Sequence, residues 1–264
     1  MTLLQAVALG ALQGLTEFLP VSSSGHLVLA RQLLQINEVP SLFDIVLHIA
    51  TLGAVVVMFR STIVGILTSL VRFIQRASDE VDKENQRLFV WLFVASVLTG
   101  VLGFTFSALH IESTPRIVAL LFVVTGGILL VSRRFQGSVE YDRVGWKQAV
   151  MTGVAQGFGV FPGISRSGIT ISAALLSGMS REKAGEFSFL LAIPAILGAL
   201  LVRSDEANRL MSVVTPVALT AGVLVAFVVG LLSLKLLLRL VKLGKISVFA
   251  FYLVPLGIVS FILL

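Results

Sequence analysis

Residues 13–26 read Gln-Gly-Leu-Thr-Glu-Phe-Leu-Pro-Val-Ser-Ser-Ser-Gly-His, so a carboxylate, three hydroxyls and an imidazole stand in an otherwise apolar N-terminal region. The stretch recurs 143 positions later, where residues 156–170 read Gln-Gly-Phe-Gly-Val-Phe-Pro-Gly-Ile-Ser-Arg-Ser-Gly-Ile-Thr. Identities continue at the same spacing, without a gap, at Gln5 and Gln148, Gly10 and Gly153, Ala30 and Ala173, and Leu33 and Leu176. Chance does not produce such a match over a short window, so we infer two related halves, residues 1–144 and 145–264.

The composition is that of an integral membrane protein. Hydrophobic residues make up 56% of the 264 residues and charged residues only 13%, with a mean hydropathy of +1.00, whereas soluble domains carry about 25% charged residues. The net charge of +6 is explained by Lys and Arg in cytoplasmic loops, so no nucleic-acid partner is expected. The absence of cysteine from the sequence excludes a disulfide, an iron–sulfur cluster and a thiol nucleophile.

Six uncharged apolar runs are candidates for membrane-spanning helices, at residues 45–59, 88–109, 117–132, 187–202, 213–234 and 246–264. The two motif segments, residues 1–42 and 145–186, differ from them because Pro, Gly and Ser interrupt each one and each holds ionisable groups. We therefore expect an all-α membrane bundle with six spanning helices and two broken re-entrant helical hairpins.

The distribution of basic residues predicts the orientation of the chain. Lys and Arg are concentrated in residues 60–87, 133–147 and 235–245, and loops of this kind remain in the cytoplasm. Four arginines would then face outward: Arg31, Arg116, Arg203 and Arg209. On this count the two halves are antiparallel, and the hairpins enter from opposite faces and meet near the midplane, which is the inverted-repeat arrangement of many transporters.

The first motif has the features of an anion-binding site. Gln13 and Glu17 are four residues apart and share one face of a helix that Pro20 ends. A serine among residues 22–24 can cap the following helix, and a helix N-terminus with hydroxyl donors suits an anion. The second motif repeats this with Ser165 and Ser167. Two such N-termini that converge would present free backbone N–H groups to one anion.

The two copies differ in their chemistry. Aligned residues that differ are Glu17 and Val160, Ser23 and Arg166, and His26 and Ile169. The first half thus supplies a carboxylate, a hydroxyl that can act as a nucleophile and a titratable base, while the second supplies a permanent cation suited to phosphate. This combination predicts attack of a serine on phosphorus, with Arg166 stabilising the charge. A carboxylate near phosphate suggests a bridging Mg²⁺ or Ca²⁺.

Structural roles remain open for several of these residues. The three serines at 22–24 could act only as caps, and their order as nucleophile candidates stays open. Backbone or packing contacts are the alternative for Gln13, Gln156, Ser165, Ser167 and Thr170. Glu17 and His26 could form a structural pair, although ionisable groups at membrane depth favour function. His48 is expected to be a buried, hydrogen-bonded histidine near the site, and His110 a solvated one.

With these motifs, the chain resembles the bacitracin-resistance family of undecaprenyl-diphosphate phosphatases over essentially its whole length. The resemblance is carried by residues 13–26 and 162–170 and by residues 186–194, Glu-Phe-Ser-Phe-Leu-Leu-Ala-Ile-Pro. It implies a multi-pass enzyme of the bacterial plasma membrane that removes the terminal phosphate of undecaprenyl diphosphate and regenerates the lipid carrier of cell-wall synthesis. It also implies a divalent cation, a site that opens to the outer face, and inverted repeats with re-entrant helices.

By motif position, the resemblance implies that Ser23 is the nucleophile, His26 its base, Arg166 the diphosphate-binding cation and Glu17 a metal ligand. Further substrate contacts are implied at Gln13, Ser22, Ser24, Gly163, Ser165, Ser167 and Thr170. The expected partners are the prenyl diphosphate lipid and membrane lipids, and a homo-oligomer is left open. The alternative function is a secondary transporter or lipid flippase on the same inverted repeat, with Arg166 binding an anion and Glu17 or His26 carrying a proton.

Overall fold

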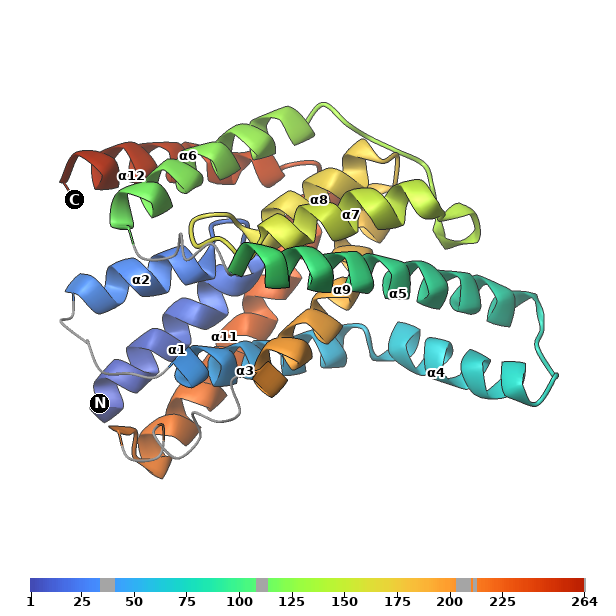
Figure 1. Cartoon of the computed structure of the whole chain (residues 1–264), viewed down its shortest axis with the longest axis horizontal. Helices are drawn as coiled ribbons and strands as arrows, with labels where there is room; N and C mark the ends of the chain where they lie inside the picture. Colours follow the sequence, from blue (N-terminus) through green and yellow to red (C-terminus); the bar gives the residue numbers. More distant parts are fainter. Residues whose placement is uncertain (34–40, 108–113, 203–209, 211–212, 264) are drawn as a thin grey trace.

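The computed structural model describes residues 1–33, 41–107, 114–202, 210 and 213–263, and these form a helical bundle (Figure 1). The helices are α1 (Leu3–Phe18), α2 (Ser23–Leu33), α3 (Ser41–Met58), α4 (Arg60–Ile74), α5 (Glu80–Ser107), α6 (Pro115–Ser132), α7 (Trp146–Phe158), α8 (Arg166–Leu176), α9 (Arg181–Val202), α11 (Pro216–Lys242) and α12 (Ala250–Leu263). Short 3₁₀ helices lie at η2 (Tyr141–Arg143) and η4 (Ile246–Phe249). In the described part of the chain, β pairing is limited to one isolated bridge, between Val139 and Met179. The expected all-α fold is confirmed.

Five helices are long and apolar enough to cross a membrane: α5, α6, α9, α11, and η4 together with α12. A sixth candidate is the pair α3 and α4, which are bent by 77° relative to each other. The apolar run at residues 45–59 therefore forms α3, and the chain turns sharply after it instead of continuing straight. Arg203, Arg209 and His110 lie outside the described residues.

The two motif segments form broken helices, as the sequence predicts. α1 ends at Phe18, just before Pro20, and α2 begins at Ser23; α7 ends at Phe158 and α8 begins at Arg166. Each of these helices has 16 residues or fewer, which is short of the roughly 20 residues that a full span needs. In Figure 1, α1 and α2 extend from the centre toward one end of the molecule, and α7 and α8 toward the other. The assignment of two inverted repeats with a boundary at residue 144 stays a prediction.

The first helix of each motif packs very closely on a long helix. α1 packs on α11, and α7 on α5. A Cβ atom added at Gly10 would lie 2.3 Å from the carbonyl oxygen of Gly222, and one at Gly153 would lie 2.7 Å from that of Ala95. Small residues permit this approach of two helix backbones, and it fixes the depth at which each broken helix ends.

We expect Gly10→Ala to lower the stability of the folded protein by roughly 1–3 kcal/mol, because the added methyl group forces α1 away from α11. Gly127→Ala on α6 is the matched control, since a Cβ there meets no atom within 4 Å and alanine favours a helix over glycine by about 1 kcal/mol. Thermal unfolding in detergent measures both. A Gly10→Ala protein that melts at or above the temperature of the Gly127→Ala protein would contradict this packing.

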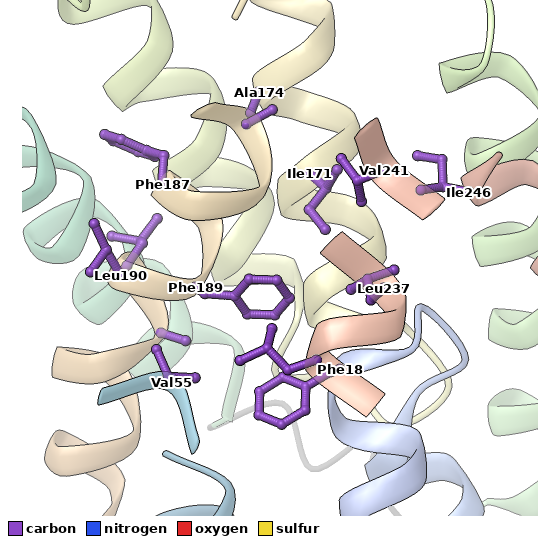
Figure 2. Close-up of a cluster of buried hydrophobic side chains, with 14 of the residues drawn as sticks. Phe18, Val55, Ile171, Ala174, Phe187, Phe189, Leu190, Leu237, Val241 and Ile246 are labelled. Atoms are coloured by element: carbon purple, nitrogen blue, oxygen red, sulfur yellow. The ribbon is translucent and has the colours of Figure 1, made fainter. Parts of the chain in front are cut away.

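A buried apolar cluster joins the end of α1 to α8, α9 and α11 (Figure 2). Phe18 packs edge-on against Phe189 of α9, with ring centroids 5.5 Å apart. Ile171 of α8 and Leu237 of α11 belong to the same cluster. Because Phe18 directly follows Glu17, this core holds the Glu17 backbone in place relative to α8 and α9.

Candidate active site

Glu17 is the centre of a polar cluster in the last turn of α1. Its Oε2 atom accepts hydrogen bonds from Gln13 Nε2 at 2.9 Å and from Ser23 Oγ at 2.6 Å. Its Oε1 atom accepts one from Arg166 Nη2 at 2.9 Å. The side chain of Glu17 is only 7% exposed, and that of Arg166 is 23% exposed. The structure thus brings together the carboxylate and serine of the first motif and the cation of the second, as the sequence predicts for one composite site.

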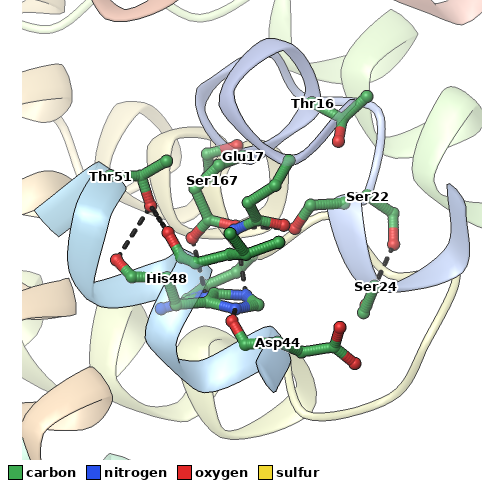
Figure 3. A network of polar contacts seen from close by, with 12 residues as sticks. Thr16, Glu17, Ser22, Ser24, Asp44, His48, Thr51 and Ser167 are labelled. Carbon is green, nitrogen blue, oxygen red and sulfur yellow. Dashed lines mark hydrogen bonds and ion pairs between the residues drawn. The ribbon is translucent and has the colours of Figure 1, made fainter. Parts of the chain in front are cut away.

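His48 of α3 is a further partner of Glu17. Its Nε2 lies 3.2 Å from Glu17 Oε2, and its Nδ1 lies 2.7 Å from the backbone oxygen of Asp44. Figure 3 shows the ring between these two groups. From the sequence His48 is expected only to be buried near the site, because a single histidine in an apolar run carries no signal for its partner.

A cavity of about 580 Å³ opens beside this cluster. The polar residues that line it come from both motifs, and they include Glu17, Ser22, Ser23, Ser24, Ser165 and Arg166. His48 also lines it, and the cavity continues between α5 and α9 along apolar and glycine residues such as Phe104 and Gly198. The cavity therefore has a charged, hydroxyl-rich part next to a mainly apolar part.

The N-termini of α2 and α8 meet at this cavity. Ser22 Oγ accepts from the backbone N–H of Gly25 at 3.4 Å and from that of Gly163 at 3.0 Å, so it caps α2 and ties the two motifs together. Ser165 Oγ caps α8 by accepting from the Gly168 N–H at 3.1 Å. Thr125 of α6 supports the junction by donating to the Gly163 oxygen at 3.0 Å.

These caps leave part of each helix N-terminus free. Within the described part of the chain, the backbone N–H groups of Ser23, Ser24, Arg166 and Ser167 have no hydrogen-bond acceptor. Free N–H groups at the start of a helix attract anions through their dipoles. Together with the Arg166 guanidinium, they make the cavity suitable for a phosphate group.

His26 has different partners from those predicted. Its Nδ1 lies 2.8 Å from the Ser22 backbone oxygen, and its Nε2 lies 2.8 Å from the Tyr252 hydroxyl on α12. Among the described residues, no hydrogen bond joins His26 to Ser23, and His26 is not part of the cavity lining. The Ser22 backbone has a φ of 67°, which is uncommon for a residue other than glycine, and His26 stabilises this turn. The sequence gives no signal for Tyr252, which lies in an apolar run.

The other residues implied as substrate contacts occupy several kinds of position. Thr170 Oγ1 donates to the Arg166 backbone oxygen at 2.8 Å, and with Ser167 it lines a water-sized cavity of about 20 Å³ beside Glu17. Gly163 has a φ of +97°, and its backbone N–H donates to Ser22 Oγ. Gln13 is fully buried, with its amide oxygen unpaired. The remaining two, Ser24 and Ser165, line the large cavity.

The residues present do not form a protein-only cation site. The described residues contain no group of three His, Cys, Asp or Glu side chains that could hold a metal. Glu17 is the one carboxylate among the described residues that line the cavity, and both its oxygens already accept hydrogen bonds. Mg²⁺ is, however, commonly held by one or two carboxylates together with substrate phosphates and water. The site fits a cation only in that shared form.

Comparison with known proteins gives one family over nearly the whole chain. The family described as "Bacitracin resistance protein BacA" matches residues 6–259. A Treponema denticola protein named undecaprenyl-diphosphatase is 46% identical over 258 residues, which cover 98% of this chain and 96% of that protein. Proteins of the same name from Desulforapulum autotrophicum and Methanosphaera stadtmanae are 41% and 37% identical, each over 99% of this chain and 98% of their own length.

Proposed function

The chain belongs to the family of the bacitracin resistance protein BacA, and on this basis we propose that it is an undecaprenyl-diphosphatase. It is a multi-pass membrane protein that removes the terminal phosphate of undecaprenyl diphosphate and returns undecaprenyl phosphate, the lipid carrier of cell-wall synthesis. The observation that carries the proposal is the cluster of Ser23, Glu17 and Arg166 beside two helix N-termini that keep free N–H groups.

The cavity supports a lipid diphosphate as the substrate. Its polar part offers Arg166 and the N–H groups at the starts of α2 and α8, which suit a phosphate group with several negative oxygens. Its apolar part between α5 and α9 suits the start of a prenyl chain, because such a chain gains free energy from burial among nonpolar groups.

We assign the nucleophile to Ser23 and its base to Glu17. Ser23 Oγ donates to Glu17 Oε2 at 2.6 Å, a distance within which a proton can pass directly from one oxygen to the other. The Ser23 oxygen forms a bond to the terminal phosphorus as the bond from phosphorus to the bridging oxygen breaks, and undecaprenyl phosphate leaves with the electron pair. Water then attacks the phosphoserine as the bond from phosphorus to the Ser23 oxygen breaks. Inorganic phosphate leaves with the oxygen and hydrogens of the water, and Glu17 returns its proton to the Ser23 oxygen.

Arg166 and the backbone N–H groups stabilise the charge on the phosphoryl oxygens in both steps. On substrate binding, Arg166 turns the N–H group that it donates to Glu17 toward the phosphate, so that two of its N–H groups bind phosphate oxygens. That exchange frees Glu17 to act as a base at the moment when the substrate is bound. His26 stabilises the strained backbone at Ser22 and so orients Ser23.

A divalent cation, Mg²⁺ or Ca²⁺, is proposed to enter with the diphosphate and to use Glu17 as its protein ligand. When bound, it would neutralise part of the phosphate charge. We place the protein in the bacterial plasma membrane with the site open to the outer face. The support is the distribution of basic residues: with the Lys- and Arg-rich residues 60–87, 133–147 and 235–245 in the cytoplasm, Arg31 and Arg116 would face outward.

The protein purified in detergent is expected to release inorganic phosphate from a C55 prenyl diphosphate when Mg²⁺ or Ca²⁺ is present. Chelation with EDTA should lower the rate by at least about tenfold, because an unneutralised diphosphate binds and reacts poorly, and added Mg²⁺ should restore it. A colorimetric phosphate assay measures both. The transporter alternative would be favoured if the purified protein releases no phosphate but, after reconstitution into sealed vesicles, accumulates an anionic lipid or solute in them.

A further inference from the structure

His48 is a polar side chain of the cavity that the proposed reaction does not use. Its ring joins α3 to the end of α1 through two contacts, at 2.7 Å to the Asp44 backbone oxygen and at 3.2 Å to Glu17 Oε2. A carbonyl oxygen only accepts, so Nδ1 carries a hydrogen. Nε2 faces the ionised Glu17 carboxylate, which can also only accept a hydrogen bond. Nε2 therefore carries a second hydrogen and donates it to Oε2. The ring is thus held at one end and presents an N–H group at the other.

The two oxygens of Glu17 are held unequally. Oε1 has Arg166 as its donor, whereas Oε2 has Gln13, Ser23 and His48. When Arg166 turns to the diphosphate, Oε1 loses this donor. The terminal torsion of a glutamate is soft, so the protein groups that then orient the carboxylate are its Oε2 partners.

Of those partners, His48 is the one that can anchor Glu17 from outside. Ser23 is the group that reacts, and Gln13 lies on the same helix as Glu17 and moves with it. The start of α3 is tied to α2 by the ion pair of Arg31 with the Asp44 carboxylate at 2.6 Å, and Asp44 in turn fixes the His48 ring (Figure 3).

We propose that His48 is a positioning residue, which holds Glu17 Oε2 toward Ser23 after Arg166 has moved to the substrate. The proposal rests on the proposed function and adds to it a residue on a third element. His48 acts through Glu17 and needs no contact with the diphosphate.

His48→Leu is expected to lower kcat by about 10- to 100-fold, which corresponds to the loss of one hydrogen bond to a charged group, and to leave KM within about twofold. His48→Gln should retain most of the activity, because the glutamine amide nitrogen reaches about as far as Nε2 and donates. His48→Asn should behave like His48→Leu, since its shorter amide reaches only as far as Nδ1. Phosphate release at varied concentrations of undecaprenyl diphosphate gives kcat and KM for each.

Thr51→Val is the matched control on α3. Thr51 is buried, and among the described residues its hydroxyl donates only within its own helix, at 2.8 Å to the His48 backbone oxygen and 3.4 Å to that of Leu47. We expect this variant to keep kcat within about twofold, because helix-internal bonds of this kind add little. Gel filtration and thermal unfolding in detergent select the variants that fold like the wild type.

A double variant separates positioning from a merely structural role. Because His48 acts through Glu17, adding His48→Leu to Glu17→Gln should slow the residual reaction by less than about threefold, far less than His48→Leu does in the wild type. The proposal is overturned if His48→Leu slows the reaction equally in the wild type and in the Glu17→Gln protein. It is also overturned if His48→Gln is as slow as His48→Leu, or if His48→Leu raises KM and leaves kcat unchanged. Wild-type protein without phosphatase activity contradicts the proposed function itself, whereas an active wild type with an equally active Leu variant contradicts only the role of His48.

Discussion

Replacing Arg166 with lysine is expected to lower kcat/KM for undecaprenyl diphosphate by roughly 10²- to 10³-fold, although the charge is retained. A guanidinium holds its N–H groups in fixed directions, so it can pair with Glu17 before the substrate binds and then bind two phosphate oxygens of the substrate. A lysine ammonium is a compact charge on a flexible stem and cannot reproduce that geometry. Arg166→Ala should lower the rate further, to near the background.

The lysine variant is the more informative of the two, because alanine would leave Glu17 Oε1 without its charged donor. Glu17 is only 7% exposed, and loss of a charged partner from a buried carboxylate destabilises a fold. Arg116→Lys, at an exposed position near the start of α6, is the matched control and should be as active as the wild type. An Arg166→Lys protein with full activity would show that Arg166 only balances the charge of Glu17.

The broken helices and their meeting point are the parts of the fold that the sequence predicts best. Pro20 and the serines at 22–24 end one helix and begin the next by local chemistry, which needs no knowledge of distant contacts. The repeat then pairs this segment with residues 156–170 and so predicts that Glu17 and Arg166, 149 positions apart, belong to one site.

The contacts between elements without such signals could not be predicted. The 77° bend between α3 and α4 and the contact of His48 with Glu17 depend on how α3 packs against α1. A single polar residue in an apolar run does not show which helix it will face. The same holds for Tyr252, whose hydroxyl forms a hydrogen bond with His26 Nε2. His26 stands close to Ser23 in the sequence, and that proximity favours a direct pair; in the structure the ring bonds instead to the backbone of its own turn, at Ser22.

Ser23→Ala is expected to lower kcat by about 10³-fold or more, because it removes the attacking oxygen and leaves only electrostatic stabilisation of a direct attack by water. The neighbouring serines make different hydrogen bonds. Ser22 Oγ accepts from two backbone N–H groups, so Ser22→Ala should cost stability of about 1 kcal/mol, as for other lost helix caps. Ser24 Oγ has Ser22 Oγ as its partner, at 3.5 Å, and Ser24→Ala should slow the reaction by less than about tenfold.

The turnover of the three single variants therefore shows which serine the reaction requires. A trapping experiment then identifies the covalent intermediate. Rapid acid quenching with substrate labelled in the terminal phosphate should yield labelled protein, with the phosphate located at Ser23 by mass spectrometry. A Ser24→Ala protein slower than Ser23→Ala would move the nucleophile by one position. If Ser23→Ala is slow and the quenched wild type carries no label, water attacks the phosphorus directly, and Glu17 Oε2, with its Ser23 partner, would orient that water.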